Sequence, residues 1–270
     1  MMTKVVILCG GQGTRLREET EYKPKPMVKI GEKPILWHIM KLYSHFNLYD
    51  FILCLGYKGE AIKEYFNNYE ILANDFSVSI GSKQKRIFLT DCAETNWSVT
   101  LADTGLRAMT GTRIKRIEKY IDGSYFLATY GDAVADININ ELIEFHKKTG
   151  KIATLTGIRP PSKYGTLEIE GDSIINFNEK PRVSDYVNGG FFVFEREIFD
   201  LLSFSDDCVL ENSPLEILAK ENQLAIYKHE GFWQCMDTYR DFELLNSMHN
   251  SGDKPWMIWE KENEEYFLEK

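Results

Sequence analysis

A glycine-rich segment near the start of the chain carries the residue types that bind phosphate groups. Gly10, Gly11 and Gly13 lie close together, so the backbone can turn tightly and bring its N–H groups near an anionic ligand. Arg15 follows, and Lys25 comes later between two prolines, which disfavour a helix and restrict where the lysine can go. This combination indicates a phosphate-rich ligand. A glycine-rich turn with solvated basic side chains is the simpler alternative.

The segment differs from two well-known phosphate-binding motifs. A dinucleotide-binding fingerprint needs a glycine three residues after Gly13, where this chain has Leu16. A P-loop ends in Gly-Lys-Ser/Thr, whereas here Gly13 is followed by Thr14 and Arg15. Neither motif fits, and Leu16 argues against a nicotinamide-dependent oxidoreductase.

The elements that would position this loop alternate along the chain. Apolar runs predict strands at residues 4–9, 50–55, 125–130 and 152–157. Helical patterns predict helices at about 34–46, 59–69, 112–120 and 139–149. We therefore expect an α/β fold with a Rossmann-like, mostly parallel sheet and helices on both faces. Ligands bind at the carboxyl ends of such strands, which is where Gly10–Arg15 and Gly131–Asp132 would lie.

The remaining segments are less regular. Residues 74–104 look irregular, apart from a strand leading into a loop at 97–104. Residues 164–194 look like short strands with turns, and 195–221 and 238–250 look like helices. The C-terminal portion is therefore expected to be irregular, with short strands and helices. Because no linker or repeat stands out, we expect residues 1–270 to form a single domain.

The composition limits the class of protein. The net charge of −9 leaves no broad basic face, so nucleic acid is not an expected partner. No apolar run approaches the ~18 residues that span a bilayer, and the first one is too short for a signal peptide, so no membrane partner is expected. The five cysteines show no Cys-x-x-Cys spacing, which favours neither zinc nor disulfides. A cytoplasmic location fits best.

The glycine loop resembles the signature of sugar-1-phosphate nucleotidyltransferases. That signature reads G-G-x-G-T-R-L and then K-P-K-P, as in Gly10–Leu16 and Lys23–Pro26. Further segments resemble those of bacterial glucose-1-phosphate cytidylyltransferases, and they follow in the same order over nearly the whole chain. These segments are Lys33–Met40, Gly56–Gly59, Tyr130–Asp132, Glu179–Pro181, Asn188–Phe192 and Gly231–Thr238.

The resemblance implies a reaction and its participants. The cytidylyl group of CTP would pass to α-D-glucose 1-phosphate, giving CDP-glucose and pyrophosphate for surface polysaccharide (O-antigen) sugars. The resemblance also implies Mg²⁺ as cofactor and a homo-oligomer, with a hexamer as one arrangement. Two alternatives stay open: the same chemistry with dTTP or UTP, and a non-catalytic paralogue that binds sugar nucleotides. The presence of Arg15, Lys25, Asp132 and Asp237 argues against the paralogue.

The resemblance also implies roles for individual residues. The expected catalytic residues are Arg15, at the departing phosphates, and Lys25, at the α-phosphate. Asp132 and Asp237 are the expected metal-binding pair. The expected nucleotide-binding residues are Leu8, Cys9, Gly10, Gly11, Gln12, Gly13, Thr14, Arg15, Lys25, Thr110, Arg113 and Gly131. The expected sugar-phosphate-binding residues are Tyr164, Gly165, Glu179, Lys180, Asn188 and Gly189.

Several of these residues have structural alternatives. Thr110 reads equally well as a helix cap. Asp132 could cap a loop, and Asp237 could cap the helix that begins near Thr238. Gly189 and the following glycine could form a β-bulge. Ala133 departs from the family pattern, because a glycine is expected there. It would disturb the site if the position needs a positive φ or lies against the ligand.

Overall fold

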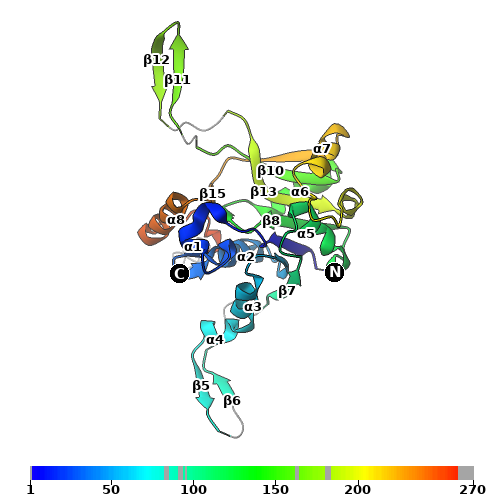
Figure 1. Ribbon diagram of the computed structural model, residues 1–270, viewed down its shortest axis with the longest axis vertical. Helices are drawn as coiled ribbons and strands as arrows, with labels where there is room; N and C mark the ends of the chain where they lie inside the picture. Colours follow the sequence, from blue (N-terminus) through cyan, green and yellow to red (C-terminus); the bar gives the residue numbers. More distant parts are fainter. Residues whose placement is uncertain are drawn as a thin grey trace, which may run out of the picture.

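A seven-stranded sheet forms the centre of the protein, as seen in a computed structural model (Figure 1). The structure describes residues 2–81, 85–90, 94, 96–161, 164–179 and 184–260. The strand order is β14-β10-β13-β8-β1-β4-β7, and β13 alone runs antiparallel to its neighbours among these seven strands. The strands are β1 (Lys4–Leu8), β4 (Asp50–Leu55), β7 (Ser98–Asp103), β8 (Tyr125–Tyr130), β10 (Ala153–Ile158), β13 (Val187–Glu195) and β14 (Leu224–His229). The expected mostly parallel sheet is confirmed.

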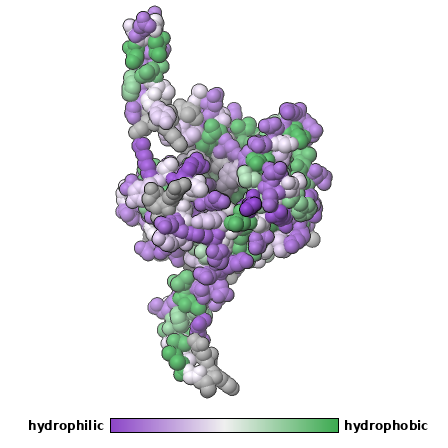
Figure 2. Space-filling model, in the orientation of Figure 1, coloured by the Kyte–Doolittle hydropathy of each residue, from purple (hydrophilic) through white to green (hydrophobic). Residues whose placement is uncertain are grey.

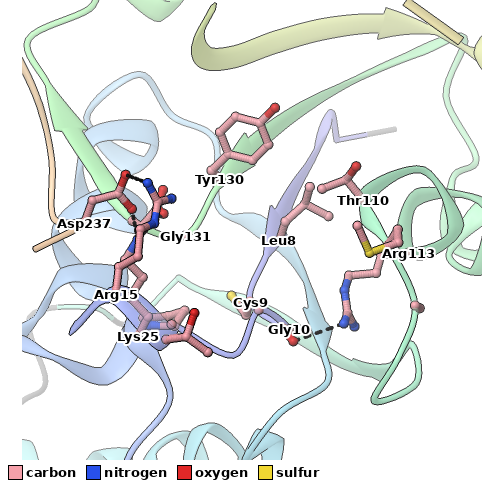
Figure 3. A pocket seen from close by; sticks show the side chains of 17 residues that line it. Leu8, Cys9, Gly10, Arg15, Lys25, Thr110, Arg113, Tyr130, Gly131 and Asp237 are labelled. Carbon is pink, nitrogen blue, oxygen red and sulfur yellow. Dashed lines mark hydrogen bonds and ion pairs between the residues drawn. The ribbon is translucent and has the colours of Figure 1, made fainter. Parts of the chain in front are cut away.

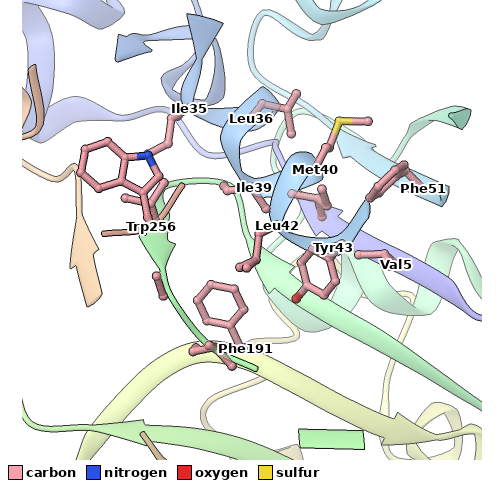
Figure 4. Packing of buried hydrophobic residues seen from close by; sticks show 14 of the residues in the cluster. Val5, Ile35, Leu36, Ile39, Met40, Leu42, Tyr43, Phe51, Phe191 and Trp256 are labelled. Atoms are coloured by element: carbon pink, nitrogen blue, oxygen red, sulfur yellow. The ribbon is translucent and has the colours of Figure 1, made fainter. Parts of the chain in front are cut away.

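Helices cover both faces of this sheet, as expected. The alternation along β1 shows why: Val5 and Ile7 pack into one apolar cluster with α2 and α6, whereas Val6 packs into a second cluster with α5 and α7. Figure 4 shows the first cluster, in which residues of α2 such as Tyr43 approach Phe191 of β13. The helices are α2 (Ile35–His45), α3 (Gly59–Asn67), α5 (Thr110–Arg116), α6 (Ile139–Thr149), α7 (Ser213–Lys220) and α8 (Tyr239–Ser251).

Two β-hairpins extend from the body at opposite ends of the molecule (Figure 1). One is formed by β5 (Phe76–Ser79) and β6 (Lys85–Phe88) after the short helix α4 (Tyr69–Ala73), and the other by β11 (Thr166–Glu170) and β12 (Ser173–Asn178). Both carry apolar side chains on their surface (Figure 2). The exposed apolar residues on these strands include Val78, Ile87, Leu167, Ile169, Ile174, Ile175 and Phe177.

Short elements complete the fold. They are α1 (Arg17–Thr20), β2 (Lys29–Ile30), β3 (Lys33–Pro34), β9 (Ala133–Ala135), β15 (Trp233–Cys235) and the 3₁₀ turns Thr14–Leu16, Lys25–Met27, Glu118–Tyr120 and Arg196–Leu201. Strand β15 pairs with β9, which brings the C-terminal portion back to the end of β8. None of the helices within the described ranges is long and apolar enough to cross a membrane.

Two helix predictions need correction. The helix expected at 112–120 is α5 followed by a separate 3₁₀ turn. The helix expected at 195–221 is wrong in its middle: a 3₁₀ turn ends at Leu201, and α7 begins only at Ser213. The segment between them includes Ser205 and Asp206, whose backbone carbonyls bond to other segments instead of continuing a helix. Pro214 in the first turn of α7 also suits a helix start and not a helix interior.

Candidate active site

A cavity of about 340 Å³ opens at the carboxyl ends of β1 and β8 (Figure 3). This is the edge of the sheet where a ligand was expected. Most of the predicted nucleotide-binding and metal-binding residues converge on it. The lining residues are Leu8, Cys9, Gly10, Gly11, Gly13, Thr14, Arg15, Lys25, Pro26, Ala108, Met109, Thr110, Arg113, Tyr130, Gly131, Asp132 and Asp237. Gln12 instead faces a neighbouring hollow with Tyr57 and Glu21.

Arg113 supports the glycine loop through hydrogen bonds. Its guanidinium is buried and donates to the Gly10 carbonyl oxygen at 3.0 Å, to the Leu55 carbonyl oxygen at 3.0 Å and to Thr104 Oγ1 at 2.8 Å. A Cβ atom at Gly10 would collide with this guanidinium, whereas one at Gly11 would meet open space. The first glycine is therefore required by packing, and the second leaves room for a ligand beside the backbone.

Lys25 lies between the two predicted metal-binding aspartates. Its Nζ is 2.7 Å from Asp132 Oδ2 and also contacts Asp237 Oδ1, while Arg15 Nη1 lies 3.1 Å from Asp237 Oδ2 (Figure 3). Burial acts against the charge of Lys25, but the two carboxylates outweigh it and raise the pKa of Lys25 above its usual value. Two cations and two carboxylates from distant segments thus meet at one end of the cavity.

A family model described as nucleotidyl transferase matches residues 4–241. The chain belongs to the nucleotidyl transferase family. It is 48% identical over 259 residues to the glucose-1-phosphate cytidylyltransferase of Salmonella typhi, and the match covers 95% of this chain and 100% of that protein.

Solved structures share the fold at low sequence identity. UTP-bound UGPase from Acinetobacter baumannii gives a TM-score of 0.67 at 16% identity, covering 97% of this chain and 98% of that chain. HddC from Yersinia pseudotuberculosis complexed with GMP-PN gives a TM-score of 0.66 at 23% identity, covering 92% of this chain and 100% of that chain. These two likenesses concern the fold alone.

The aspartate pair of this nucleotidyl transferase suits a divalent cation. Mg²⁺ takes one or two carboxylates and completes its shell with substrate phosphate oxygens and water. The Lys25 ammonium already places a positive charge against both Asp132 and Asp237. No cluster of three or more His, Cys, Asp or Glu side chains able to hold a metal occurs in the described part of the chain. The pair therefore fits a metal that is held jointly with the nucleotide, and not a self-sufficient protein site.

The capping alternatives for Asp237 and Thr110 are wrong. Helix α8 is capped by Thr238, whose hydroxyl accepts from the Asp241 backbone N–H in a capping box, so Asp237 is not the cap. Helix α5 has Met109 at its N-cap position. The Thr110 hydroxyl donates instead to Glu211 Oε2 at 2.7 Å. Both side chains are thus available to the cavity they line.

The departure at Ala133 does not distort the site. Ala133 begins β9 and pairs with Cys235, and it is not one of the residues with a positive φ. Cys9 is fully buried, and burial raises the pKa of its thiol well above the usual value. It therefore presents a small neutral thiol to the cavity.

The predicted sugar-phosphate residues form two groups. Asn188 and Gly189 lie beside the cavity: Asn188 Nδ2 donates to the Tyr130 hydroxyl at 3.1 Å, and Trp233 Nε1 donates to the Gly189 carbonyl oxygen at 2.7 Å. The pairing of β13 with β10 shifts register here and Gly190 has φ +80°, so the expected β-bulge is present.

Tyr164, Gly165 and Glu179 lie at the base of the β11–β12 hairpin. Tyr164 is 79% exposed, and a Cβ atom at Gly165 would lie 3.2 Å from Glu179 Oε2. Lys180 lies outside the described residues. Whether this group reaches the sugar phosphate stays a prediction.

Two functional candidates were not assigned a role from the sequence. Tyr130 lines the cavity, and its hydroxyl donates to Glu211 Oε1. Glu211 thus connects Tyr130 with Thr110 across the cavity wall. Tyr130 could have been found because it directly precedes Gly131 at the end of β8. Glu211 gives no comparable signal, because it lies in the loop before α7 and is brought to the site by the fold.

Proposed function

We propose that this nucleotidyl transferase transfers the cytidylyl group of CTP to α-D-glucose 1-phosphate, releasing CDP-glucose and pyrophosphate. The observation that carries the proposal is the 48% identity to the Salmonella typhi glucose-1-phosphate cytidylyltransferase over the full length of that protein. The cavity supports it, because it gathers the glycine loop and two basic side chains at the carboxyl end of the sheet.

In the proposed reaction, an oxygen of the sugar phosphate attacks the α-phosphorus of CTP. The new phosphorus–oxygen bond forms as the bond to the β-phosphate breaks, and pyrophosphate leaves. Such a transfer depends on alignment and on positive charge where negative charge accumulates. Backbone N–H groups near Gly11 would hold the triphosphate, Arg15 the departing β- and γ-phosphates, and Lys25 the α-phosphate. Lys180 would bind the sugar phosphate.

We further propose that Asp132 and Asp237 hold Mg²⁺ together with the triphosphate; a divalent metal is typical of this family. Bound there, the metal would polarise the α-phosphate and offset its developing charge. The Lys25 ammonium would then have to exchange part of its ion pairing with the aspartates for contact with the phosphate, because it has only three N–H donors. The aspartates would thus position Lys25 before the nucleotide arrives.

The setting of the enzyme is also a proposal. We propose a single catalytic domain in the cytoplasm that supplies CDP-glucose for surface polysaccharide sugars. The buried unpaired thiols of Cys9 and Cys54 support a reducing compartment. We propose a homo-oligomer as well, with a hexamer as one arrangement. The two extended hairpins support this, because isolated two-stranded hairpins with exposed apolar side chains gain stability when they are covered.

Product analysis with matched variants tests the proposed function. Wild-type protein incubated with CTP, glucose 1-phosphate and Mg²⁺ should form CDP-glucose and pyrophosphate in equal amounts. Asp132→Asn and Asp237→Asn should each lose most of this activity, whereas Asp253→Asn, at an exposed position, should keep it. Absence of a sugar nucleotide with any triphosphate would favour a non-catalytic binding protein. Full, Mg²⁺-dependent activity in both active-site variants would exclude the proposed metal pair.

A further inference from the structure

A chain of hydrogen bonds crosses the wall of the cavity opposite Lys25. Glu211, half-buried in the loop before α7, accepts from the Thr110 hydroxyl at 2.7 Å and from the Tyr130 hydroxyl. Tyr130 in turn accepts from Asn188 Nδ2 at 3.1 Å. Thr110 and Tyr130 both line the cavity, and Thr110 lies on the side away from Lys25 in Figure 3.

The direction of each of these hydrogen bonds is fixed by neighbouring groups that can only donate or only accept. The Gly190 backbone N–H donates to Asn188 Oδ1 at 2.8 Å, so Asn188 must present its NH₂ group to Tyr130. The Leu210 backbone N–H donates to Thr110 Oγ1 at 2.9 Å. The ionised carboxylate of Glu211 can only accept. Each hydroxyl therefore gives its single proton to Glu211.

The pKa of Tyr130 agrees with this arrangement. Burial and the negative charge of Glu211 raise it above its usual value, so the phenol keeps its proton at neutral pH. With that proton committed to Glu211, the free lone pairs of the Tyr130 and Thr110 hydroxyl oxygens can only accept. At this end of the cavity the Thr110 and Tyr130 hydroxyl oxygens are thus hydrogen-bond acceptors.

We propose that Glu211 determines base choice by holding Thr110 and Tyr130 as acceptors for the 4-amino group of cytosine. The inference rests on the proposed use of CTP. Uracil and thymine carry a carbonyl oxygen at the same ring position, which would face these acceptors without a proton between them. Leu8, Ala108 and Met109 line the cavity near Thr110 and offer apolar contact for a planar base. The phosphates would lie at the cationic end, beside Arg15 and Lys25.

Glu211 would act as a positioning residue, since it works through the two hydroxyls. Glu211→Gln tests this, because an amide can donate to either hydroxyl and so free its proton for a carbonyl oxygen. We expect the ratio of kcat/KM for CTP to that for UTP to fall about tenfold or more. Thr110→Val and Tyr130→Phe should lower the same ratio, and they keep the proposal testable if Glu211→Gln does not fold. Glu216→Gln, at an exposed position of α7, is the matched control.

A nucleotide analogue gives a measurement that would not change if Glu211 had only a structural role. Pyrimidin-2-one riboside triphosphate has hydrogen in place of the 4-amino group. It should be a poorer substrate than CTP for the wild type by about tenfold, and the difference should shrink in Glu211→Gln. An equal loss with CTP, UTP and the analogue would overturn the proposal, as would a change confined to the KM of glucose 1-phosphate. If the wild type itself does not prefer CTP, the proposed function fails first, which is a distinct result.

Discussion

Replacing Lys25 by methionine should separate its electrostatic role from its packing. Methionine keeps a long unbranched side chain but removes the ammonium that touches Asp132 and Asp237. Two carboxylates would then remain at one end of the cavity. Among the described residues, their remaining ion-pair partner is Arg15, whose side chain is 71% exposed. We therefore expect the variant to be less stable, slower in transfer and more receptive to divalent cations.

The charge and the burial of Lys25 allow the loss in free energy of unfolding of Lys25→Met to be estimated. Two opposite charges about 4 Å apart interact by about 4 kcal/mol at an effective dielectric constant of roughly 20. The Lys25 side chain is only 12% exposed, so bringing its ammonium out of water cancels much of that gain. A net loss of about 1–3 kcal/mol in the free energy of unfolding is expected. Transfer should slow by roughly 10²- to 10³-fold, as when one charge-stabilising donor is removed.

Urea unfolding and steady-state kinetics measure the two effects. The two carboxylates left without the Lys25 ammonium should repel each other, so the variant should unfold at a lower urea concentration than the wild type. Added Mg²⁺ should also stabilise Lys25→Met more than the wild type. Lys29→Met makes the same chemical change at an exposed position and is the control. A variant with the wild-type unfolding midpoint, normal turnover and no added response to Mg²⁺ would refute this reasoning.

Three further predictions concern Gly10, Lys180 and His38. Gly10→Ala should lower the free energy of unfolding by about 1–3 kcal/mol in urea titrations, because the new methyl group displaces the Arg113 guanidinium. Gly11→Ala should have little effect on stability. Equal losses in the two variants would contradict the role of Arg113 in supporting the glycine loop. Lys180→Ala should raise the KM for glucose 1-phosphate more than the KM for CTP, and unchanged sugar-phosphate kinetics would remove its assigned role. Burial lowers the pKa of His38 to about 4. The unfolded chain therefore binds a proton at this histidine as the pH falls below about 6.5, whereas the folded protein does not until about pH 4. The free energy of unfolding should consequently fall by about 2–4 kcal/mol by pH 4. In His38→Gln the dependence of unfolding free energy on pH should flatten, and an unchanged slope would show that other groups cause it.

The sequence allowed the cationic end of the cavity to be predicted because its determinants are local. Glycines after a buried strand and a lysine between prolines restrict the backbone by themselves, and parallel strands bring their carboxyl ends to one edge. Asp132 comes two residues after the end of β8, so the same rule places it. Asp237 required the family resemblance, since nothing local shows that β15 returns to pair with β9.

The other wall of the cavity depends on packing between distant segments. The sequence predicts Arg113 as a ligand-binding cation, and only the fold shows that its guanidinium also bonds to oxygens of three separate segments. Glu211 meets Thr110 and Tyr130 because the chain between Leu201 and Ser213 leaves the helical path predicted for it. Apolar periodicity in 195–221 favoured one helix, but backbone hydrogen bonds to other segments stabilise the loop instead.

The central claim, cytidylyl transfer to glucose 1-phosphate, is tested most directly by competition. The protein would be given CTP, UTP, dTTP and GTP at equal concentrations with glucose 1-phosphate and Mg²⁺, and the sugar nucleotides quantified by mass spectrometry at low conversion. The product ratios then equal the ratios of kcat/KM. CDP-glucose should exceed every other product by at least about tenfold. A mixture dominated by UDP-glucose or dTDP-glucose would contradict the account.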